Sequence, residues 1–367
     1  MAKRQCSVES VERLMNRLFK FYKNKRIFIT GHTGFKGSWM CKVLSISGAR
    51  VFGYALEPNT NPNLFEGANI AAEMENSTIG NVCSYQGLLR SLKESDAEIV
   101  IHMAAQPLVR QSYQDPIGTY ETNVMGTVHI LEAIRHCKTV KSFVNVTTDK
   151  VYLNKEWEWG YRESDRLDGY DPYSNSKSCS ELVTSSYKKS FFSDGSVAIS
   201  TCRAGNVIGG GDFSLDRIIP DCVRAVLKNE SIIVRNPHST RPYQHVLEPV
   251  IAYLNLAMLQ YEDISKAGTY NVGPEDCDCV TTGDLVNRFC KKWSGNATWK
   301  NESEKDSPHE ANYLKLDCSK IKRELGWSPR WHIDEAIAKT VEWSKGYQNN
   351  SDINAIMAAQ IREYLNG

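Results

Sequence analysis

The sequence predicts an α/β fold, in which a doubly wound parallel sheet is accompanied by a smaller, mostly α C-terminal domain. Short apolar runs alternate with helical patterns over the first two hundred residues, and a glycine loop lies between the first run and its helix. Such alternation is typical of a parallel sheet covered by helices on both faces. The chain has 367 residues, and at about 150 residues per domain it is long enough for two domains.

Composition and charge exclude several classes of protein. Lys and Arg total 44 against 43 Asp and Glu, so a net charge of +1 gives no general attraction to nucleic acids or anionic membranes, and we expect neither as a partner. The 11 cysteines show no disulfide or zinc-binding spacing, which indicates reduced thiols and no metal site. The charged N-terminus has no signal-peptide pattern, and we expect the cytoplasm as the location.

The expected elements follow from hydrophobic periodicity. Apolar side chains at helical spacing predict an N-terminal helix over residues 1–24, outside the main domain. Strands are then expected at residues 26–30, 51–55, 99–103, 142–146 and 197–203, and helices at 39–46, 124–136 and 176–187.

Beyond residue 205 the pattern loosens into glycines and prolines, which indicates a second domain. We assign residues 25–205 to the first domain and residues 206–240 and 273–367 to the second. A helical pattern and a strand-like run within residues 241–272 predict that this segment returns to the main sheet.

Gly31, Gly34 and Gly37 lie between the first expected strand and its helix. A tight turn with exposed helix N–H groups suits a pyrophosphate, so this context predicts a nucleotide site. His32 and Lys36 lie in the same loop and either contact the phosphates or ribose or remain solvated. Glu57, near the end of the second strand, is a candidate for a ribose contact.

Tyr173 and Lys177 are four residues apart at the start of an expected helix, so both side chains lie on one helical face. A nearby ammonium favours the phenolate, which can accept a proton from a hydroxyl group. Such a pair occurs on many helices. It is evidence for a catalytic site only in combination with the glycine loop that precedes it. Thr147, Thr148 and Asp149-Lys150 end a strand, where ligands bind to open parallel sheets. For Asp149 a turn or helix cap is the structural alternative.

Five segments resemble the extended short-chain dehydrogenase/reductase family, also described as NAD-dependent epimerases and dehydratases, and within it the dehydratase branch that acts on CDP-glucose. They are GHTGFKGSW (31–39), TTDKVY (147–152), GYDPYSNSKSCSELV (169–183), RAGNVIGGGDF (203–213) and RPYQHVLEP (241–249). The resemblance runs from Arg26 to about Trp331. It implies a Rossmann-type NAD-binding domain, followed by a nucleotide-sugar-binding domain.

The resemblance also implies the binding residues. Those for NAD are Gly31, His32, Gly34, Phe35, Lys36, Gly37, Asn81, Val82, Ala104, Ala105, Gln106, Thr147, Tyr173 and Lys177, with Asn123 in a structural role. Those for the CDP-sugar are Asn206, Arg217, Arg241 and His245, with Arg203, Asp212 and His309-Glu310 as further candidates. Asn81 departs from the family pattern, because a neutral amide stands where an Asp is usual.

The reaction implied is a 4,6-dehydration of a kind used in making deoxysugars such as those of O-antigens. Tyr173, assisted by Thr148 and Lys177, takes the 4-hydroxyl proton while the C4 hydride passes to NAD. Asp149 and Lys150 jointly eliminate water across C5 and C6, with Asp149 preferred as acid and Lys150 as base. The hydride then returns to C6, so the enzyme is a lyase in outcome.

The same residues leave two alternative functions open, and the resemblance also implies an oligomeric state. A nucleotide-sugar epimerase shares the glycine loop and the Tyr-Lys pair but does not use an acid and a base at C5 and C6. A non-catalytic NAD-sensing protein has no need of Tyr173 or Lys177, and both are present. The resemblance implies a homo-oligomer, either a dimer or a dimer of dimers.

Overall fold

The computed structural model describes residues 17–295, 297–302 and 313–366. Most of the expected N-terminal helix lies outside these residues. Residues 17–22 are helical, and the side chains of Leu18 and Tyr22 are fully buried against the main domain.

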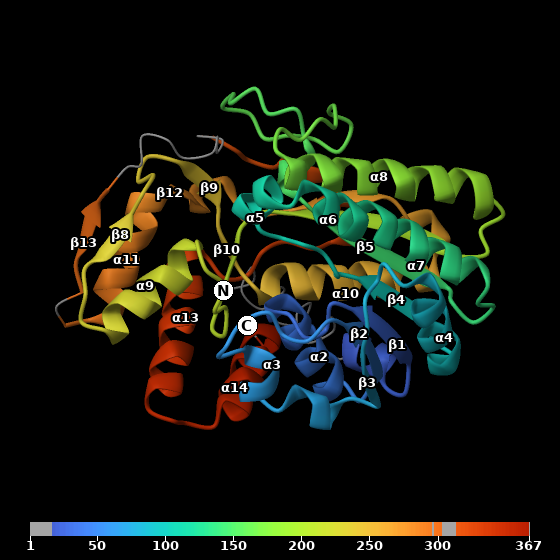
Figure 1. Cartoon of the computed structure of the whole chain (residues 1–367), viewed down its shortest axis with the longest axis horizontal. Coiled ribbons are helices and arrows are strands. Elements are labelled where there is room, and N and C mark those ends of the chain that lie inside the picture. The colour runs from blue at the N-terminus through green and yellow to red at the C-terminus, as the bar shows by residue number, and fades with distance from the viewer. Residues whose placement is uncertain (1–16, 296, 303–312, 367) are drawn as a thin grey trace, which may run out of the picture.

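Seven parallel strands form the central sheet, in the order β11-β6-β5-β4-β1-β2-β3 (Figure 1). Their bounds are β1 (Arg26–Thr30), β2 (Arg50–Ala55), β3 (Asn76–Ile79), β4 (Ile99–His102), β5 (Ser142–Thr148), β6 (Ala198–Ala204) and β11 (Thr269–Val272). Every residue of β4, β5 and β6 is buried, as expected for strands covered on both faces. The fold class is therefore confirmed.

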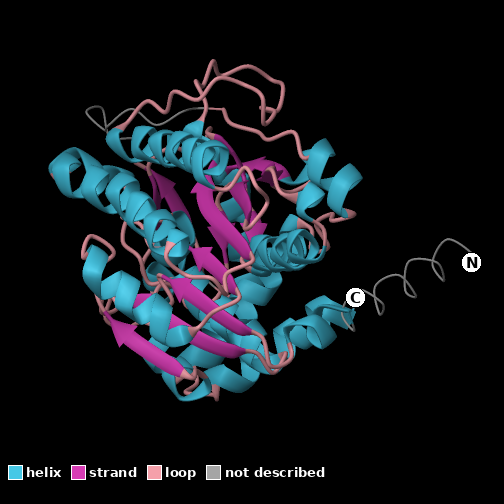
Figure 2. Ribbon diagram, turned by 90° about the vertical axis from the view of Figure 1, so that its right-hand side faces the viewer, coloured by secondary structure: helices cyan, strands magenta, loops and turns pink. Residues whose placement is uncertain are grey.

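Helices cover both faces of the sheet (Figures 1 and 2). One apolar cluster joins the sheet to α4 (Tyr85–Ser95), α7 (Gly126–Arg135) and α8 (Pro172–Phe191). A second cluster joins the other face to α2 (Phe35–Ile46), α10 (Leu247–Glu262), α12 (Ser319–Leu325) and α14 (Ile353–Asn366). Short helices complete this part: α3 (Leu64–Gly67), α5 (Val109–Gln114), α6 (Pro116–Tyr120) and the π-helix η2 (Glu121–Met125).

A smaller unit with its own apolar cluster lies beyond one end of the sheet, on the left of Figure 1. It contains the helices α9 (Ile218–Leu227), α11 (Thr282–Trp293) and α13 (Ile333–Gln348). Three two-stranded ladders accompany them: β7 (Val207–Ile208) with β10 (Gln244–His245), β9 (Thr240–Pro242) with β12 (Cys279–Thr281), and β8 (Ile232–Val234) with β13 (Trp299–Asn301).

Chain segments cross between the two units. The strand β11 pairs with β6 in the main sheet, with Thr269 opposite Thr201, and α10 packs beneath the same sheet. Five 3-10 or π turns are described: η1 (Ile70–Glu73), η2, η3 (Asp149–Val151), η4 (Ile264–Lys266) and η5 (Asp276–Asp278). Within the described ranges, no helix has the length and apolar character needed to cross a bilayer.

Candidate active site

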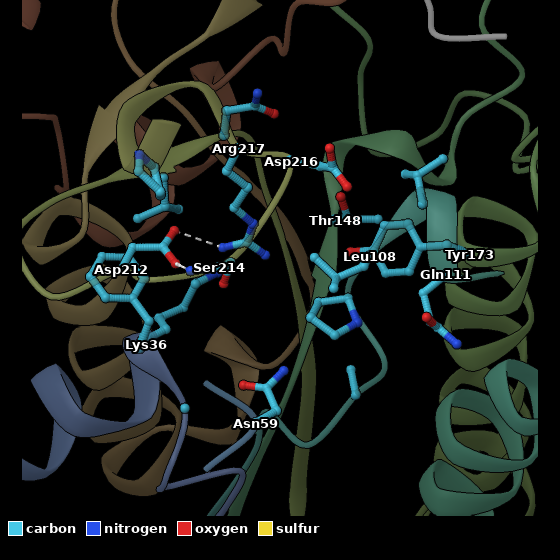
Figure 3. Close-up of a pocket in the computed structure, with 18 of the residues that line it drawn as sticks. Lys36, Asn59, Leu108, Gln111, Thr148, Tyr173, Asp212, Ser214, Asp216 and Arg217 are labelled. Atoms are coloured by element: carbon cyan, nitrogen blue, oxygen red, sulfur yellow. Dashed lines mark hydrogen bonds and ion pairs between the residues drawn. The ribbon is translucent and has the colours of Figure 1, made fainter. Parts of the chain in front are cut away.

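A cavity of about 1130 Å³ opens between the central sheet and the smaller unit (Figure 3). Its walls come from the segments that follow β1, β4, β5 and β6 and from the smaller unit around α9 and β8. A single small-molecule site usually measures about 300–1,000 Å³, so this cavity has room for more than one ligand. It lies at the carboxyl ends of the parallel strands, where ligands bind in open α/β sheets.

The glycine loop forms one wall of the cavity. Gly31 has a φ of +80°, and a Cβ atom there would lie 2.8 Å from the backbone nitrogen of Ala104. A Cβ atom at Gly37 would lie 2.2 Å from the carbonyl oxygen of Gly31. Gly34 begins α2 without a side-chain cap, which leaves the first N–H groups of that helix for a ligand. This backbone fits a dinucleotide pyrophosphate.

The helix α8 presents Tyr173 and Lys177 to the middle of the cavity. The side chain of Asp171 caps this helix by accepting a hydrogen bond from the Ser174 backbone N–H, at 2.9 Å. Burial raises the pKa of Tyr173 to about 12, and a hydrogen bond with Thr148 acts in the opposite direction. Tyr173 must be a phenolate to accept a proton from a substrate, and nearby cations and donors are needed to stabilise that form.

Lys177 is such a cation. Its Nζ atom donates a hydrogen bond to the carbonyl oxygen of Val146, at 3.2 Å, and its side chain is nearly fully buried. Burial and the neighbouring charge of Lys36 lower the pKa of Lys177 to about 8. Burial likewise lowers the pKa of Lys36 to about 8. Keeping either lysine protonated thus costs free energy. The pKa of both lysines responds to any anion or oxygen atom that enters the cavity.

Asp149 and Lys150 follow directly from the end of β5 and line the same cavity. Asp149 is 1% exposed, and its Oδ1 accepts a hydrogen bond from the Thr148 hydroxyl at 3.0 Å. Its Oδ2 atom is buried without a partner among the described residues. Burial raises the pKa of Asp149, although Lys150, Thr148 and Arg241 oppose that effect. A carboxyl group with a raised pKa is suited to act as an acid.

Lys36 of α2 and polar residues of the smaller unit face Tyr173 across the cavity. Figure 3 shows Lys36, Asp212, Ser214 and Arg217 on one side and Tyr173 on the other. An ion pair of 3.0 Å joins the Arg217 Nη1 atom to the Asp212 carboxylate. Asn206 and Arg241 line the same wall.

Two histidines expected to bind ligands do not line this cavity. The ring of His32 is buried behind the glycine loop, where its Nε2 atom lies 2.8 Å from the Ser77 hydroxyl. His245 is packed edge-on between Trp39 and Trp331, with ring centroids 5.8 and 4.8 Å away. Both rings are buried in the protein interior instead. Burial lowers the pKa of His32 to about 4 and that of His245 to about 3.

Two further polar residues have structural roles. The Gln106 side chain folds back on its own loop, where its Oε1 atom accepts a hydrogen bond from the Leu108 backbone N–H at 2.6 Å. Arg203 forms a buried ion pair of 3.0 Å with Glu181. Neither is part of the cavity wall formed by the described residues. His309 and Glu310 lie outside the described residues.

Most of the remaining expected residues line the cavity. The cavity wall includes Phe35, Glu57, Asn81, Val82, Ala104, Ala105, Thr147 and Asp212. The Asn123 side chain bridges two segments, because it accepts a hydrogen bond from the Gln106 backbone and donates one to the Ser176 hydroxyl, both at 2.9 Å. The Asn81 Oδ1 atom accepts from the Cys83 backbone N–H at 2.9 Å, which fixes the orientation of its amide.

Sequence reasoning missed many of the lining residues: Asn59, Leu108 and Gln111 from the segments after β2 and β4, and the others from the smaller unit. The additional lining residues include Asn59, Leu108, Gln111, Leu215, Asp216, Ile218, Asp221, Ile233, Arg235, Asn236, Ser239, Tyr243 and Thr282. They come from six separate segments with no shared spacing, so only the tertiary fold brings them together.

One cluster outside the cavity bears on the expectation of no metal site. Donor atoms of Cys277, Asp278 and His332 lie within 4.8 Å of one another. The Asp278 carboxylate is already engaged by the His332 Nδ1 atom at 2.7 Å and by the Ile333 backbone N–H at 3.0 Å. These bonds give the cluster a structural role at the start of α13.

Comparisons with known proteins agree with this geometry. The family model described as GDP-mannose 4,6 dehydratase matches residues 28–340. CDP-glucose 4,6-dehydratase of Salmonella typhimurium is 47% identical over 351 residues, covering 94% of this chain and 97% of that protein. dTDP-glucose 4,6-dehydratase of Streptomyces antibioticus is 30% identical over 261 residues, covering 70% of this chain and 72% of that protein.

Solved structures of lower identity share the fold. A UDP-glucose 4-epimerase from Thermotoga maritima with UDP-glucose has a TM-score of 0.74 at 21% identity, covering 88% of this chain and 99% of that one. A UDP-glucuronic acid 4-epimerase from Bacillus cereus, in complex with UDP-glucuronic acid and NAD, gives the same TM-score, identity and coverage.

Proposed function

The chain belongs to the GDP-mannose 4,6 dehydratase family, and on that premise we propose that it converts CDP-D-glucose to CDP-4-keto-6-deoxy-D-glucose. The reaction is that of an NAD-dependent hydro-lyase, and its product suits the synthesis of deoxysugars such as those of O-antigens. The observation that carries the proposal is the grouping of Asp149 and Lys150 with the Tyr173–Lys177 pair in one cavity. Oxidation, elimination and reduction each need one of these groups.

The first step removes a hydride from C4 of the glucose and a proton from its 4-hydroxyl group. When bound, NAD would supply the hydride acceptor for C4 and the hydride donor for C6, and the proton that C5 regains with that hydride would come from Lys150. The Tyr173 oxygen accepts the proton of the 4-hydroxyl group, and the C4–O bond becomes a carbonyl. The Lys177 ammonium, about one helical turn away, and the Thr148 hydroxyl stabilise the phenolate in a site where burial opposes it.

Elimination then uses the strand end. The new C4 carbonyl makes the C5 proton acidic, and Lys150 accepts that proton while C5=C6 forms. Asp149 donates its proton to the 6-hydroxyl group, so the C6–O bond breaks and water leaves. The raised pKa of Asp149 supports the acid role. Lys150 lines the cavity directly beside this carboxyl group.

The residues around the cofactor wall fit NAD. The glycine loop offers backbone N–H groups to the pyrophosphate, and Val82, Ala104 and Ala105 give apolar surface along the same wall. Arg217 and Arg241 suit the pyrophosphate of the sugar nucleotide, because a guanidinium group binds phosphate oxygens in pairs.

A direct assay tests this function. The full chain is incubated with NAD and, separately, CDP-, dTDP-, UDP- and GDP-glucose, and the products are analysed by mass spectrometry. We expect loss of one water from CDP-glucose with no net consumption of NAD. The Tyr173→Phe variant should lose at least about 100-fold in rate, because it lacks a general base. Tyr113→Phe, an exposed tyrosine on α5, should retain full activity. An interconversion of sugar epimers without water loss would contradict the proposal.

We also propose that two copies associate through α6 and α8, which lie side by side on one face of the molecule (Figure 1). Four large apolar residues on this face are exposed: Ile117, Tyr120, Met125 and Leu182. Ile117 is 73% exposed and Leu182 is 59% exposed, which is costly for an unpartnered surface. Light scattering should give the mass of a dimer or a tetramer, and Leu182→Glu should reduce it. A monomeric wild-type chain would contradict this assembly.

A further inference from the structure

An ion pair in the wall of the cavity is not used by the proposed chemistry. The Arg235 Nη1 atom lies 2.7 Å from the Asp216 carboxylate, and both side chains are partly exposed, at 38% and 42%. Both residues line the cavity. We propose that Asp216 and Arg235 select the nucleobase of the substrate and favour cytosine over uracil and thymine. This inference rests on the proposed function and specifies how the same site chooses its nucleotide.

The position of the ion pair follows from the order of groups in a sugar nucleotide. The sugar must reach Tyr173, so the pyrophosphate comes next, and Arg217 faces Tyr173 across the cavity (Figure 3). The nucleoside then extends further into the smaller unit, where Asp216 directly precedes Arg217 and Arg235 follows β8. The base is therefore brought to this ion pair.

Apolar surface for a base ring lies at the same place. Leu215 is 67% exposed and Ile233 is 39% exposed, although both are large apolar residues that line the cavity. Ile218, at the start of α9, also contributes to the wall. Exposed apolar side chains beside a charged pair form a surface that can pack against the face of a base while polar groups meet its edge.

The hydrogen-bonding edge of the base decides the preference. Cytosine presents an amino group as donor beside ring and carbonyl acceptors, whereas uracil and thymine present O4 as an acceptor at the amino position. A carboxylate only accepts hydrogen bonds and a guanidinium group only donates them. Asp216 thus matches the cytosine amino group, and Arg235 matches its acceptors. With uracil the carboxylate faces an oxygen, which is repulsive.

A second carboxylate strengthens the preference for the cytosine amino group. Asp221, in the first turn of α9, also lines the cavity and interacts with both Asp216 and Arg235. Its own ion pair is formed with Arg224. Asp216 and Asp221 together favour a base with a donor at the amino position and disfavour a base with an acceptor at that position.

Asp216→Asn is the sharpest test, because the backbone at Asp216 has a φ of +58° and asparagine tolerates this left-handed region as well as aspartate does. The full chain is titrated by calorimetry with CDP and with UDP. We expect the wild-type chain to prefer CDP, and Asp216→Asn to reduce the CDP-to-UDP affinity ratio about tenfold or more. Arg235→Gln should reduce the same ratio.

Asp96→Asn is the matched control, because it breaks a 2.7 Å ion pair with Arg26 of similar exposure far from the cavity wall. It should leave both affinities unchanged. An unchanged ratio in Asp216→Asn and Arg235→Gln, or a wild-type chain that binds CDP and UDP equally, would overturn the inference. Water loss from CDP-glucose is measured separately, so failure of base selection is distinguishable from failure of the proposed dehydration.

Discussion

Two lysines that line the cavity are buried at the expense of stability. Lys36 and Lys177 come from different helices, and burial lowers the pKa of each to about 8. Their positive charges repel each other and destabilise the folded state. A ligand that brings oxygen atoms between them relieves this penalty, so the same feature that weakens the free protein strengthens binding.

Lys177→Met should therefore stabilise the protein while it abolishes oxidation. The folded pKa of Lys177 is about 8 against an ordinary value of 10.5, so its charge costs roughly 3 kcal/mol below pH 8. The unfolded chain binds more protons between these two values, so the penalty fades as the pH rises from about 8 to about 10.5. Urea unfolding at pH 7 and at pH 10 should show a gain for the variant at pH 7 only.

The exposed Lys189 on the same helix provides the control, and Lys189→Met should change the free energy of unfolding at neither pH. A loss of stability in Lys177→Met at pH 7 would show that the hydrogen bond to Val146 outweighs the cost of burial.

Lys150→Met separates oxidation from elimination. Tyr173 and Lys177 remain, so the C4 hydride still leaves the sugar, but no group accepts the C5 proton. We expect dehydration to slow by about 100-fold or more, with a lasting absorbance of reduced nicotinamide. Lys155→Met, a lysine stacked on Trp157 in the following loop, should behave as wild type. Unchanged dehydration in Lys150→Met would exclude this base.

The direction of a side chain can be predicted from the sequence when the position of its backbone alone determines that direction. Tyr173 and Lys177 share a helical face, and Asp149 follows a strand, so all three reach the cavity. His32 and His245 lie in equally suggestive motifs, yet their rings point into the core. Their direction depends on partners such as Ser77 and Trp331, which are distant in sequence and carry no local signal.

At the scale of elements, the start of α8 decides where the proposed catalytic pair, Tyr173 and Lys177, lies. Asp171 and Pro172 define the first turn, and Tyr173 and Lys177 follow one turn apart. Asp171→Ala should cost about 1 kcal/mol in the free energy of unfolding and should reduce dehydration more than tenfold, because Tyr173 shifts. Thr281→Ala removes the equivalent cap of α11 and should cost similar stability with little loss of activity. Equal activity losses would contradict a positioning role for the α8 cap.

Element boundaries were predicted well where burial is complete and poorly elsewhere. All residues of β5 and β6, and all of β1 except Arg26, are buried, and the expected bounds of these strands differ from the observed ones by at most two residues. The edge strand β3, with the sequence NSTI, has no such run and was missed. The residues of β3 have no strand pattern of their own, and this segment is a strand because it pairs with β2.

On the scale of the whole molecule, two units share one cavity, and the smaller unit completes it. The fold of the first unit was predictable because its helices and strands alternate regularly, whereas the wall formed by Leu215 to Ile218 and by Ile233 to Asn236 has no local pattern. Under the proposed function, this arrangement would hold the oxidised sugar, the reduced cofactor and the elimination groups in one cavity. Once water has left, the hydride taken from C4 would be returned to C6 of the same sugar.

Transfer of an isotope within one sugar tests this central claim most directly. CDP-glucose carrying deuterium at C4 is incubated with the full chain, and the product is analysed by mass spectrometry and NMR. The account predicts that the product has lost one water and carries the deuterium at C6. A product with hydrogen from the solvent at that position, or with deuterium still at C4, would contradict it.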